Sequence, residues 1–557
     1  MFSTKKNILQ TVALLKAYGI KQIVLSPGSR NAPLMQTFTQ EPYFNCHIIV
    51  DERNAAFYAL GIIQATLEPV AICCTSGSAL LNYAPAVSEA YYQQLPLIVI
   101  SADRSPEWIG QMDGQTLPQP GVFGSLVKKA VNLPEIKNET DEWYCNRLIN
   151  EALITCTSNA PGPVQINIPL GEPLFDYSEK NLPEVRKIHP SRPLKTVKIK
   201  PFIEKWNALP KRIILIGQMF YSQELLKTLE TLTDKYGCVI LTEHISNCTS
   251  SDFISNFDTL LYSLPEEAKE TYRPDLLITL GGHIISKRLK HFFRQFKPKE
   301  HWLLTESGEI TDLFQSLTDL IEADSITFLS ELAQSSYETE SSNFYHLWKD
   351  STNRIEEPSD DIPYTDIWAT KQFLKTLPPN SVLHLANSSA VRNAQLFQID
   401  KSIRIYSNRG VNGIESTLPS VIGFASVHPD PVYLIIGDLS FFYGLNALWN
   451  IKHIHNLRIL LVNNGGGGIF HLLPGLNKSA SLNEYVAAEH STNAKDWAVA
   501  AGIGYLSAKG KEELKSQFSS FMAESSKQSI ILEVIVDMET CKKTFQEYFH
   551  NQKQRIN

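Results

Sequence analysis

Short apolar runs alternate with longer stretches of helical periodicity along the whole chain. Each run is followed by small or polar residues, as a strand is followed by a turn. Runs of this kind are typical of strands in parallel sheets, because helices cover both faces of such sheets. The pattern predicts three sets of strands, which read KQIVLSPG, NCHIIVD, VAICCTSG, PLIVISAD and PVQINIP; then KRIILIG, CVILTE, DLLITLGG and HWLLTES; and finally SVLHLANSS, IRIYSNRG, VYLIIGDLS, LRILLVNNGG and SIILEVIVD.

Two polar segments separate these sets. The first is rich in Pro, Lys and other charged residues over residues 175–201, and the second runs from about Ser335 to Asp366. A chain of 557 residues is also too long for one core, at roughly 100–200 residues per domain. The sequence therefore predicts three doubly wound α/β domains with parallel sheets, over residues 1–180, 195–345 and 360–557.

Composition narrows the class of protein. The net charge of −7 gives no electrostatic support for a nucleic-acid partner. The longest apolar runs, such as PLIVI, are far shorter than the ~18 residues of a membrane span. The N-terminal segment has the periodicity of an amphipathic helix that ends at Gly19, which favours a helix over a signal peptide. The eight cysteines are scattered without a CxxC motif, so we expect a cytoplasmic protein without a zinc or disulfide framework.

Polar tips recur at the carboxyl ends of the predicted strands, where open parallel sheets bind their ligands. Asp438 closes one strand near the C-terminus, and Asn463 and Asn464 open a run of four glycines at the end of the next. The spacing of 26 residues (464 minus 438) fits one crossover between parallel strands. Separately, Asp438 could be a helix N-cap and Asn463-Asn464-Gly465 a turn.

Taken together, these two strand ends favour a site for a divalent cation and a diphosphate. Oxygen ligands suit Mg²⁺, which binds through one or two carboxylates and phosphate oxygens. We assign Asp438, the Asn464 side chain and the Gly466 carbonyl as ligands, with diphosphate oxygens and a water completing the octahedron. Residues 465–468 are glycines, which let the backbone approach the diphosphate closely.

Glu52 is the candidate proton-transfer group. It follows the apolar run HIIV and begins a predicted helix, DERNAAFYALGIIQAT. By itself it reads as a helix-start residue favoured by the helix dipole. Beside a thiamine diphosphate site it reads instead as a buried glutamate that hydrogen-bonds N1′ of the aminopyrimidine, since an apolar setting raises the pKa of a carboxyl and suits it to sharing a proton.

Six cations lie at or just past predicted strand ends. Most arginines are solvated surface residues, but six at presumptive site edges are unexpected in an acidic protein. Guanidinium groups bind carboxylates in a bidentate way, so this set favours a substrate with several carboxylates. The six are Arg30, Arg104, Lys287, Arg288, Arg392 and Arg409.

These motifs resemble one family of thiamine diphosphate enzymes. They are SPGSRNAPL, DERNAAFYALG, TSGSALLNYAPAVSEA, SADRSPE, GQTLPQPG, SKRL, YSNRGVNGIE and GDLS with NNGGGGIF, spread over roughly residues 8–475. Their combination resembles the 2-succinyl-5-enolpyruvyl-6-hydroxy-3-cyclohexene-1-carboxylate synthases, the MenD family. Thiamine diphosphate enzymes in general read GDG at the metal strand, whereas Leu439 follows Asp438 here, as it does in that family.

The resemblance implies a transferase of menaquinone biosynthesis that uses thiamine diphosphate with Mg²⁺ or Mn²⁺. Its reaction is decarboxylation of 2-oxoglutarate followed by 1,4-addition of the succinic semialdehyde carbanion to isochorismate. The first domain (1–180) then binds the pyrimidine, the second (195–345) is a central domain, and the third (360–557) binds the diphosphate. The resemblance also implies a homodimer whose active sites lie between the first domain of one subunit and the third of another, and it favours a homotetramer.

Roles for individual residues follow from the same resemblance. The catalytic residues it implies are Glu52, Gln115, Arg392 and Arg409. The substrate-binding residues are Ser29, Arg30, Arg104, Lys287, Arg288 and Ser388; Arg392 and Arg409 are first choices for the 2-oxoglutarate-derived part, and Arg30, Arg104 and Lys287 for isochorismate. The cofactor-binding residues are Glu52, Ser388, Ile414, Asp438, Leu439, Ser440, Asn464, Gly466, Gly467, Ile469 and Phe470, and the metal ligands among them are Asp438, Asn464 and Gly466.

Three other classes compete with this interpretation. The nearest is another 2-oxoacid carboligase of the acetolactate synthase kind, which needs fewer cations than this chain offers. A non-catalytic protein on a degenerated thiamine diphosphate fold should have lost Glu52 or Asp438, and both are present. An NAD enzyme is disfavoured because no G-x-G-x-x-G follows the first strand, and a P-loop because its Lys-Ser/Thr pair is missing.

Overall fold

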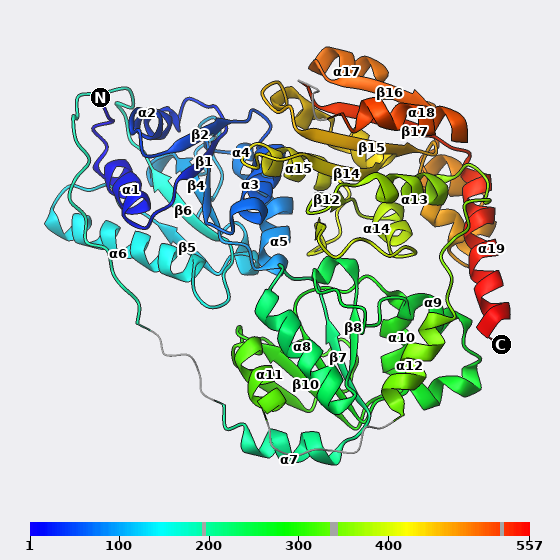
Figure 1. Cartoon of the computed structure of the whole chain (residues 1–557). Coiled ribbons are helices and arrows are strands. Elements are labelled where there is room, and N and C mark those ends of the chain that lie inside the picture. The colour runs from blue at the N-terminus through cyan, green and yellow to red at the C-terminus, as the bar shows by residue number, and fades with distance from the viewer. Residues whose placement is uncertain (192–196, 335–342, 524–527, 557) are drawn as a thin grey trace.

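The computed structural model describes residues 1–191, 197–334, 343–523 and 528–556, and it contains three parallel sheets surrounded by helices (Figure 1). The predicted fold class, three doubly wound α/β domains, is therefore confirmed. Parts of both predicted linkers, 192–196 and 335–342, lie outside the described residues, as does the predicted domain start at residue 195. Among the helices that are described, none is long and apolar enough to cross a bilayer.

The first sheet runs in the order β2-β1-β3-β4-β6-β5. Its strands are β1 (Gln22–Leu25), β2 (Asn45–Ile48), β3 (Val70–Cys74), β4 (Leu97–Asp103), β5 (Lys129–Asn132) and β6 (Val164–Pro169). Its helices are α1 (Lys6–Ala17), α2 (Ala32–Gln40), α3 (Glu52–Thr66), α4 (Ser78–Asn82), α5 (Ala84–Gln93) and α6 (Glu139–Cys156). The predicted first helix is α1, and Gly19 follows it with a φ of 84°, a left-handed conformation that glycine adopts readily.

The second sheet runs in the order β11-β10-β9-β7-β8. Its strands are β7 (Arg212–Ile216), β8 (Val239–Thr242), β9 (Leu276–Leu280), β10 (Glu300–Thr305) and β11 (Asp319–Glu322). Its helices are α7 (Lys200–Ala208), α8 (Gln223–Tyr236), α9 (Phe257–Ser263), α10 (Lys287–Gln295), α11 (Ser325–Gln334) and α12 (Phe344–Asn353).

The third sheet runs in the order β13-β12-β14-β15-β17-β16, which repeats the order of the first. Its strands are β12 (Val382–Leu385), β13 (Arg404–Tyr406), β14 (Val432–Gly437), β15 (Leu457–Asn463), β16 (Gly504–Ala508) and β17 (Ile530–Ile535). Its helices are α13 (Asp366–Thr376), α14 (Ser389–Ala394), α15 (Thr417–Ala425), α16 (Asp438–Tyr443), α17 (Lys495–Ala501), α18 (Lys511–Phe521) and α19 (Met538–Ile556).

The strands that the apolar pattern missed are all edge strands. They are β5, β11 and β16, one at the edge of each sheet. An edge strand has only one neighbour and is partly open to solvent, so it need not be continuously apolar. The sequences KAVN, DLIE and GYLSA mix polar and apolar residues accordingly, and most of their residues are at least partly exposed.

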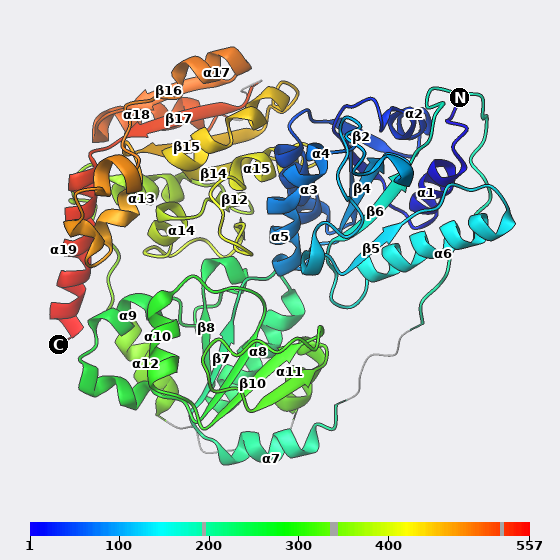
Figure 2. The same cartoon turned by 180° about the vertical axis from the view of Figure 1, so that it is seen from behind.

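The first and third domains pack directly on each other through α3 and α15, which lie side by side in both overall views (Figure 1, Figure 2). The two helix backbones touch at glycines. A Cβ atom on Gly61 would lie 1.8 Å from the Ser420 carbonyl oxygen, and one on Gly423 would lie 2.0 Å from the Tyr58 carbonyl oxygen. Any other residue at these two positions would therefore force the helices apart.

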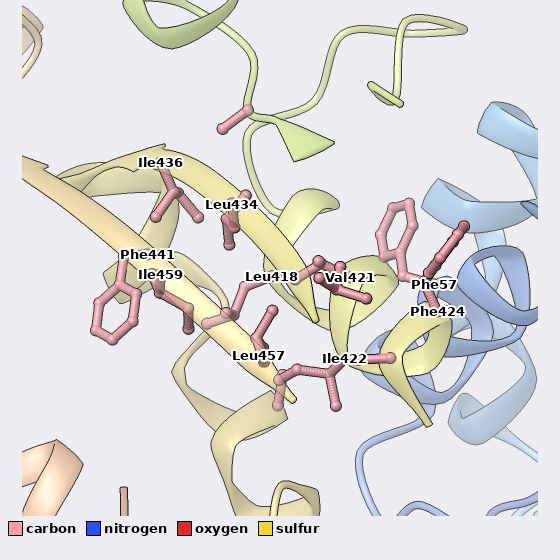
Figure 3. Packing of buried hydrophobic residues seen from close by; sticks show 14 of the residues in the cluster. Phe57, Leu418, Val421, Ile422, Phe424, Leu434, Ile436, Phe441, Leu457 and Ile459 are labelled. Atoms are coloured by element: carbon pink, nitrogen blue, oxygen red, sulfur yellow. The ribbon is translucent and has the colours of Figure 1, made fainter. Parts of the chain in front are cut away.

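One hydrophobic cluster extends across this contact. Figure 3 shows Phe57 of α3 close to Phe424 of α15, with Leu418 and Ile422 directed toward strands β14 and β15. The cluster thus contains fully buried residues of both domains. Dispersion contacts and removal of apolar surface from water stabilise it as a single core.

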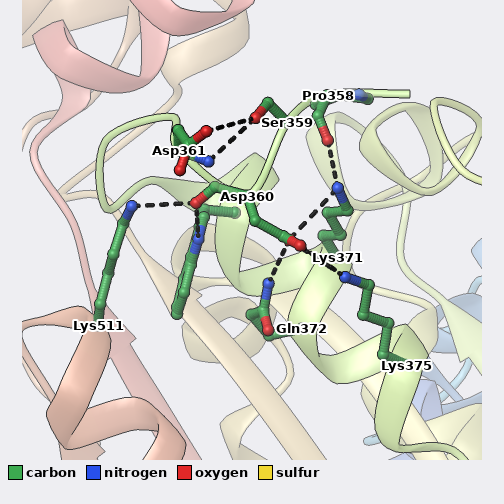
Figure 4. A network of polar contacts seen from close by, with 9 residues as sticks. Pro358, Ser359, Asp360, Asp361, Lys371, Gln372, Lys375 and Lys511 are labelled. Atoms are coloured by element: carbon green, nitrogen blue, oxygen red, sulfur yellow. Dashed lines mark hydrogen bonds and ion pairs between the residues drawn. The ribbon is translucent and has the colours of Figure 1, made fainter. Parts of the chain in front are cut away.

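The end of the second linker is docked on the third domain. Figure 4 shows Asp360 surrounded by Lys371, Gln372 and Lys375 of α13, and Lys511 reaching its carbonyl oxygen. Hydrogen bonds from Lys375 and Lys371 lower the pKa of Asp360 to about 2. Residues near 360 therefore belong to the surface of the third domain.

Candidate functional site

Asp438 is the first residue of α16 and its carboxylate binds the glycine loop after β15. The Oδ2 atom accepts hydrogen bonds from the backbone N–H groups of Gly465 (2.8 Å) and Gly466 (3.0 Å), and Oδ1 accepts one from Leu439 (2.6 Å). Gly437 is the N-cap of α16, so the capping interpretation of Asp438 is wrong. Burial raises the pKa of Asp438, while these three N–H groups and nearby His490 oppose the rise.

The residues at this loop fit a divalent cation and a diphosphate. The half-buried Asn464 side chain forms no hydrogen bond within the part of the chain that is described, so its oxygen is free to ligate. Within the described residues, Asp438 Oδ1 accepts one N–H, and the Gly466 carbonyl accepts one, from Gly468 at 3.0 Å. Each of these oxygens keeps capacity for a cation, and carboxylate, amide and carbonyl oxygens are the donors that Mg²⁺ prefers.

Asn463 has a different role from Asn464. Its amide donates to the Thr492 carbonyl (2.9 Å) and to the buried carboxylate of Glu533 (2.7 Å), and its oxygen accepts the Gly465 N–H (3.1 Å). Asn463 is therefore engaged in holding the loop. The loop also needs its glycines: Gly466 has a φ of 150°, and a Cβ atom there would lie 2.7 Å from a backbone oxygen.

Glu52 is the first residue of α3, but it does not cap this helix. The preceding Asp51 does so by accepting the Asn54 N–H at 3.2 Å. We expected a buried glutamate, whereas Glu52 is partly exposed in the single chain and forms no hydrogen bond or ion pair among the described residues. It lies near buried Cys74 and Tyr83, since its charge adds to the burial that raises the pKa of both.

Two orphaned hydroxyl groups follow β3, in the same region of the first domain. Thr75 Oγ1 and Ser76 Oγ are buried and have no hydrogen-bond partner among the described atoms. Buried polar atoms are normally paired, so these hydroxyl groups fit a polar ligand. TSGS follows a predicted strand in the sequence, but no role was predicted for Thr75 or Ser76. The structure shows that these two residues carry the unpaired hydroxyl groups.

Arg30 and Arg104 are brought together at the edge of the first domain. Arg30 is buried and donates to the Leu170 carbonyl at 3.1 Å. Burial lowers the pKa of Arg30, and the charge of Arg104 lowers it further. Ser29 and Gln115 are exposed; Gln115 has a φ of 58° and its backbone packs against Gly77.

Arg392 and Arg409 are brought together at the edge of the third domain. The buried Asn387 organises this edge: its oxygen accepts from Arg409 Nη1 (2.7 Å), and its amide donates to the carbonyls of Asn408 (2.7 Å) and Gly413 (2.9 Å). Burial and the charge of Arg392 lower the pKa of Arg409 to about 10. The Arg409 Nε atom is buried without a partner among the described residues.

Ser388, which precedes α14 beside these arginines, has a strained backbone. Its φ of 77° and ψ of −127° are rare for any residue other than glycine. Such a conformation costs on the order of 1–3 kcal/mol and is found mostly at functional sites. Arg392 Nη1 donates to the Ser388 carbonyl at 3.0 Å, so the strained residue and the arginine are directly connected.

Lys287, Arg288 and Arg392 line one cavity of about 200 Å³. Its walls come from α9 and α10 of the central domain and from α14 and α19 of the third. Phe545 and Phe549 of α19 contribute an apolar side, a region for which the sequence suggested no role. The central and third domains therefore both line this cavity.

The six cations differ in their partners. Three have carboxylate partners, in the pairs Arg30–Glu172 (3.2 Å), Arg104–Asp113 (3.0 Å) and Arg288–Asp258. Arg392 and Arg409 form no ion pair within the described parts of the chain. Arg409 is buried and Arg392 is partly buried, and desolvation lowers the pKa of both, a state in which a charge is costly unless it is paired. These two are therefore best suited to bind a dicarboxylate.

The site residues form two separate groups in the single chain. One group, in the first domain, contains Glu52, Arg30 and Arg104. The other, in the second and third domains, contains Asp438 and Arg409 with their neighbours. Across residues 1–191, 197–334, 343–523 and 528–556, no hydrogen bond or ion pair joins Glu52, Arg30 or Arg104 directly to Asp438 or Arg409.

Three buried or partly buried side chains at the site were missed by the sequence analysis. Glu89 accepts backbone N–H groups of the Arg409 loop, and Glu243 accepts those of Ile285 (2.6 Å) and Ser286 (2.7 Å), just before Lys287. His490 Nε2 lies 3.4 Å from Asp438 Oδ2. Glu89 lies inside α5, His490 lies in a loop, and Glu243, which follows β8, lies 42 residues from Ile285, so no local pattern marked these side chains.

Family models and a solved structure match this architecture. The N-terminal TPP-binding domain of thiamine pyrophosphate enzymes matches residues 10–122, the middle domain of thiamine pyrophosphate enzymes 173–385, and the C-terminal TPP-binding domain 388–534. The crystal structure of benzoylformate decarboxylase from Polynucleobacter necessarius is similar with a TM-score of 0.73, covering 96% of this chain and 99% of that chain. At 17% identity this likeness concerns the fold alone.

Curated relatives are similar over their full length. The 2-succinyl-5-enolpyruvyl-6-hydroxy-3-cyclohexene-1-carboxylate synthases of Bacteroides thetaiotaomicron and Phocaeicola vulgatus are each 47% identical, covering 100% of both chains. The synthase of Flavobacterium psychrophilum is 38% identical over 97% of this chain and 98% of its own. The chain belongs to the family of thiamine diphosphate-dependent 2-succinyl-5-enolpyruvyl-6-hydroxy-3-cyclohexene-1-carboxylate synthases.

Proposed function

We propose that this chain carries out its family's reaction with the residues assigned below. It is a transferase of menaquinone biosynthesis that decarboxylates 2-oxoglutarate and joins the remaining four-carbon unit to isochorismate, with thiamine diphosphate and Mg²⁺ or Mn²⁺ as cofactors. The observation that carries the proposal is the full-length identity of 47% to two synthases of this name. Arg409, which is buried, and Arg392, which is partly buried, form no ion pair with any described residue and so support a dicarboxylate substrate.

Thiamine diphosphate supplies the carbon nucleophile, which no amino-acid side chain provides. Asp438, the Asn464 side chain and the Gly466 carbonyl hold the divalent cation. Leu439, Ser440, Gly467, Ile469 and Phe470 form the surrounding cofactor surface, and Ile414 supports the bent cofactor. Ser440 Oγ donates to the Ile414 carbonyl, which ties these two parts of the surface together. Glu52 holds and returns the proton at N1′ of the aminopyrimidine.

The substrates are bound by the two groups of cations. Arg392 and Arg409 bind the carboxylates of 2-oxoglutarate, with Ser388 beside them. Arg30, Arg104 and Lys287 bind isochorismate, with Ser29, Gln115 and Arg288 at the same side. The acidic partners Glu172 and Asp113 then exchange places with substrate carboxylates on Arg30 and Arg104, because a guanidinium group binds either in the same bidentate way.

The domains take distinct parts in this scheme. Residues 1–180 bind the pyrimidine, residues 195–345 form the central domain and residues 360–557 bind the diphosphate. Two subunits share each active site: the first domain of one faces the third domain of the other, in a homodimer that can pair into a homotetramer. The separation of the two groups of site residues within one chain supports sharing. Two exposed aromatic residues also support it: Tyr443 (51%), the last residue of α16, and Trp449 (70%), which follows this helix.

We also place the enzyme in the cytoplasm. All eight cysteines are free thiols, and seven of them are buried. A reducing compartment suits such a set.

Hybrid dimers test the shared site. Glu52→Gln and Asp438→Ala subunits are each expected to be inactive, but a dimer of one of each contains one site with both wild-type residues. Co-expression with two different affinity tags, followed by tandem purification, isolates the hybrid dimer. We expect this dimer to have about half of wild-type activity, because one of its two sites is intact. An inactive hybrid would show that each subunit carries a complete site of its own.

A two-substrate assay tests the reaction itself. We expect product formation and sustained CO₂ release only when 2-oxoglutarate and isochorismate are both present, because turnover requires the four-carbon unit left by decarboxylation to be added to isochorismate. Pyruvate is the matched control, since it lacks the second carboxylate. Comparable turnover with pyruvate would favour an acetolactate synthase-like carboligase, the alternative activity.

A further inference from the structure

The loop that carries Arg409 is held by a glutamate from another domain. Glu89 lies on α5 of the first domain and is fully buried. Its two carboxylate oxygens accept the backbone N–H groups of Gly410 (2.6 Å) and Val411 (2.7 Å), the two residues that follow Arg409. Gln93, one turn further along α5, also donates to Glu89.

The backbones of α5 and of the loop after β13 approach each other closely at Gly410. A Cβ atom on Gly410 would lie 2.8 Å from the Glu89 carbonyl oxygen, so only glycine fits there. Gln64 of α3 adds a second connection, since its amide donates to Asn408 Oδ1 at 3.0 Å. Residues 408–411 of the third domain are thus fixed by side chains of the first.

The charge on Glu89 also matters at this position. Burial raises the pKa of Glu89, while the two backbone N–H groups, Gln93 and the positive charge of Arg409 oppose the rise. The charge of Glu89 in turn favours the charged form of Arg409, which burial and Arg392 disfavour. Glu89 is therefore a bidentate acceptor for the loop and, with Glu243, one of two negative charges that favour the charged form of Arg409.

We propose that Glu89 is a positioning residue for Arg409: it fixes the 408–411 loop from the first domain and so sets the affinity of the enzyme for 2-oxoglutarate. This inference rests on the proposed substrate role of Arg409. In the proposed dimer, the first domain of a subunit supplies Glu52 to one active site. Through Glu89, the same domain holds the Arg409 loop of the other active site. Glu89 therefore connects the two sites of the dimer within one chain.

The test uses steady-state kinetics of the full-length holoenzyme with the Glu89→Gln variant. The amide keeps the volume of the side chain but places an NH₂ group against a backbone N–H donor. We expect KM for 2-oxoglutarate to rise roughly ten- to hundredfold, the effect of losing one charge-assisted hydrogen bond to a buried group. KM for isochorismate should stay within about twofold, because Arg30, Arg104 and Lys287 lie on other loops.

The matched control is Asp312→Asn in the central domain. Asp312 also accepts two backbone N–H groups, those of Ser316 (2.9 Å) and Leu317 (3.2 Å), but on a loop without site residues. Its kinetics should match wild type. Thermal unfolding of each variant monitors the fold, and Glu89→Asp, which keeps the charge, serves if Glu89→Gln does not fold; we expect the same selective rise in KM from its shorter side chain.

A double-mutant cycle with Arg409→Lys separates the two proposals. If Glu89 acts through Arg409, the double variant should have a KM for 2-oxoglutarate no more than about twofold above that of Arg409→Lys alone. Multiplying effects, or an equal rise in KM for both substrates, would overturn the positioning role of Glu89. An unchanged KM in Arg409→Lys itself would overturn the substrate role of Arg409, which is a different failure.

Discussion

Replacing Glu52 by Gln is expected to lower the rate of carboligation by roughly 10²–10⁴-fold while leaving the fold intact. The amide has the shape of the carboxylate but can neither hold nor return a proton at N1′ of the cofactor. In the single chain, Glu52 forms no hydrogen bond or ion pair with any described residue, so its replacement removes no observed contact. Turnover at saturating concentrations of both substrates measures the loss.

The matched control for this variant is Asp51→Asn at the preceding position. Asp51 caps α3 through the Asn54 N–H, and asparagine caps helices about as well as aspartate. The control should therefore keep near-normal turnover, although losing the Asn446 amide as a donor (2.8 Å) should lower its unfolding temperature. Turnover of Glu52→Gln within a few fold of wild type would exclude Glu52 as the proton-transfer group.

Replacing Asp438 by Ala is expected to weaken Mg²⁺-dependent binding of thiamine diphosphate by more than roughly a hundredfold, since it removes a metal ligand and the acceptor that holds the loop. The buried carboxylate accepts the N–H groups of Gly465 and Gly466, so the variant also loosens the backbone that lies beside the diphosphate. Isothermal titration calorimetry with cofactor, with and without Mg²⁺, measures both effects.

Asp360→Asn is the control for cofactor binding. It also removes an aspartate charge from the third domain, but Asp360 pairs with Lys371 and Lys375 on the surface. Its binding isotherm should match that of wild type. An isotherm of Asp438→Ala that keeps its Mg²⁺ dependence would contradict the ligand assignment.

Most of the fold could be predicted because buried parallel strands are apolar on both faces. Every strand in the interior of a sheet carried that signal, including short ones such as β12. The signal fails at β5, β11 and β16, where one edge is open and polar residues are tolerated. The strand order that the first and third sheets share was not predicted. Strand order depends on which strands pair in space, and apolar runs do not specify this.

The candidate site residues could be predicted where they lie at or just past strand ends. Arg30, Arg104, Arg392 and Arg409 all stand in such tips, and the structure brings them together in pairs. Glu89 could not be found in this way, because its partner Gly410 lies 321 residues away and Glu89 itself sits inside an ordinary helix. The expectation that Glu52 is buried is not met in the single chain; within the proposed dimer, the partner's third domain covers it.

The glycine contact between α3 and α15 has a consequence for how the chain can be divided. Linkers on either side of the central domain suggest three modules that could be expressed one by one. A fragment ending near residue 190 would, however, leave the Gly61 face of α3 and its apolar neighbours open to water, together with half of a core that continues into the third domain. The first and third domains thus share one core, although the first also has a core of its own, and the central domain is inserted between them in sequence as a separate sheet.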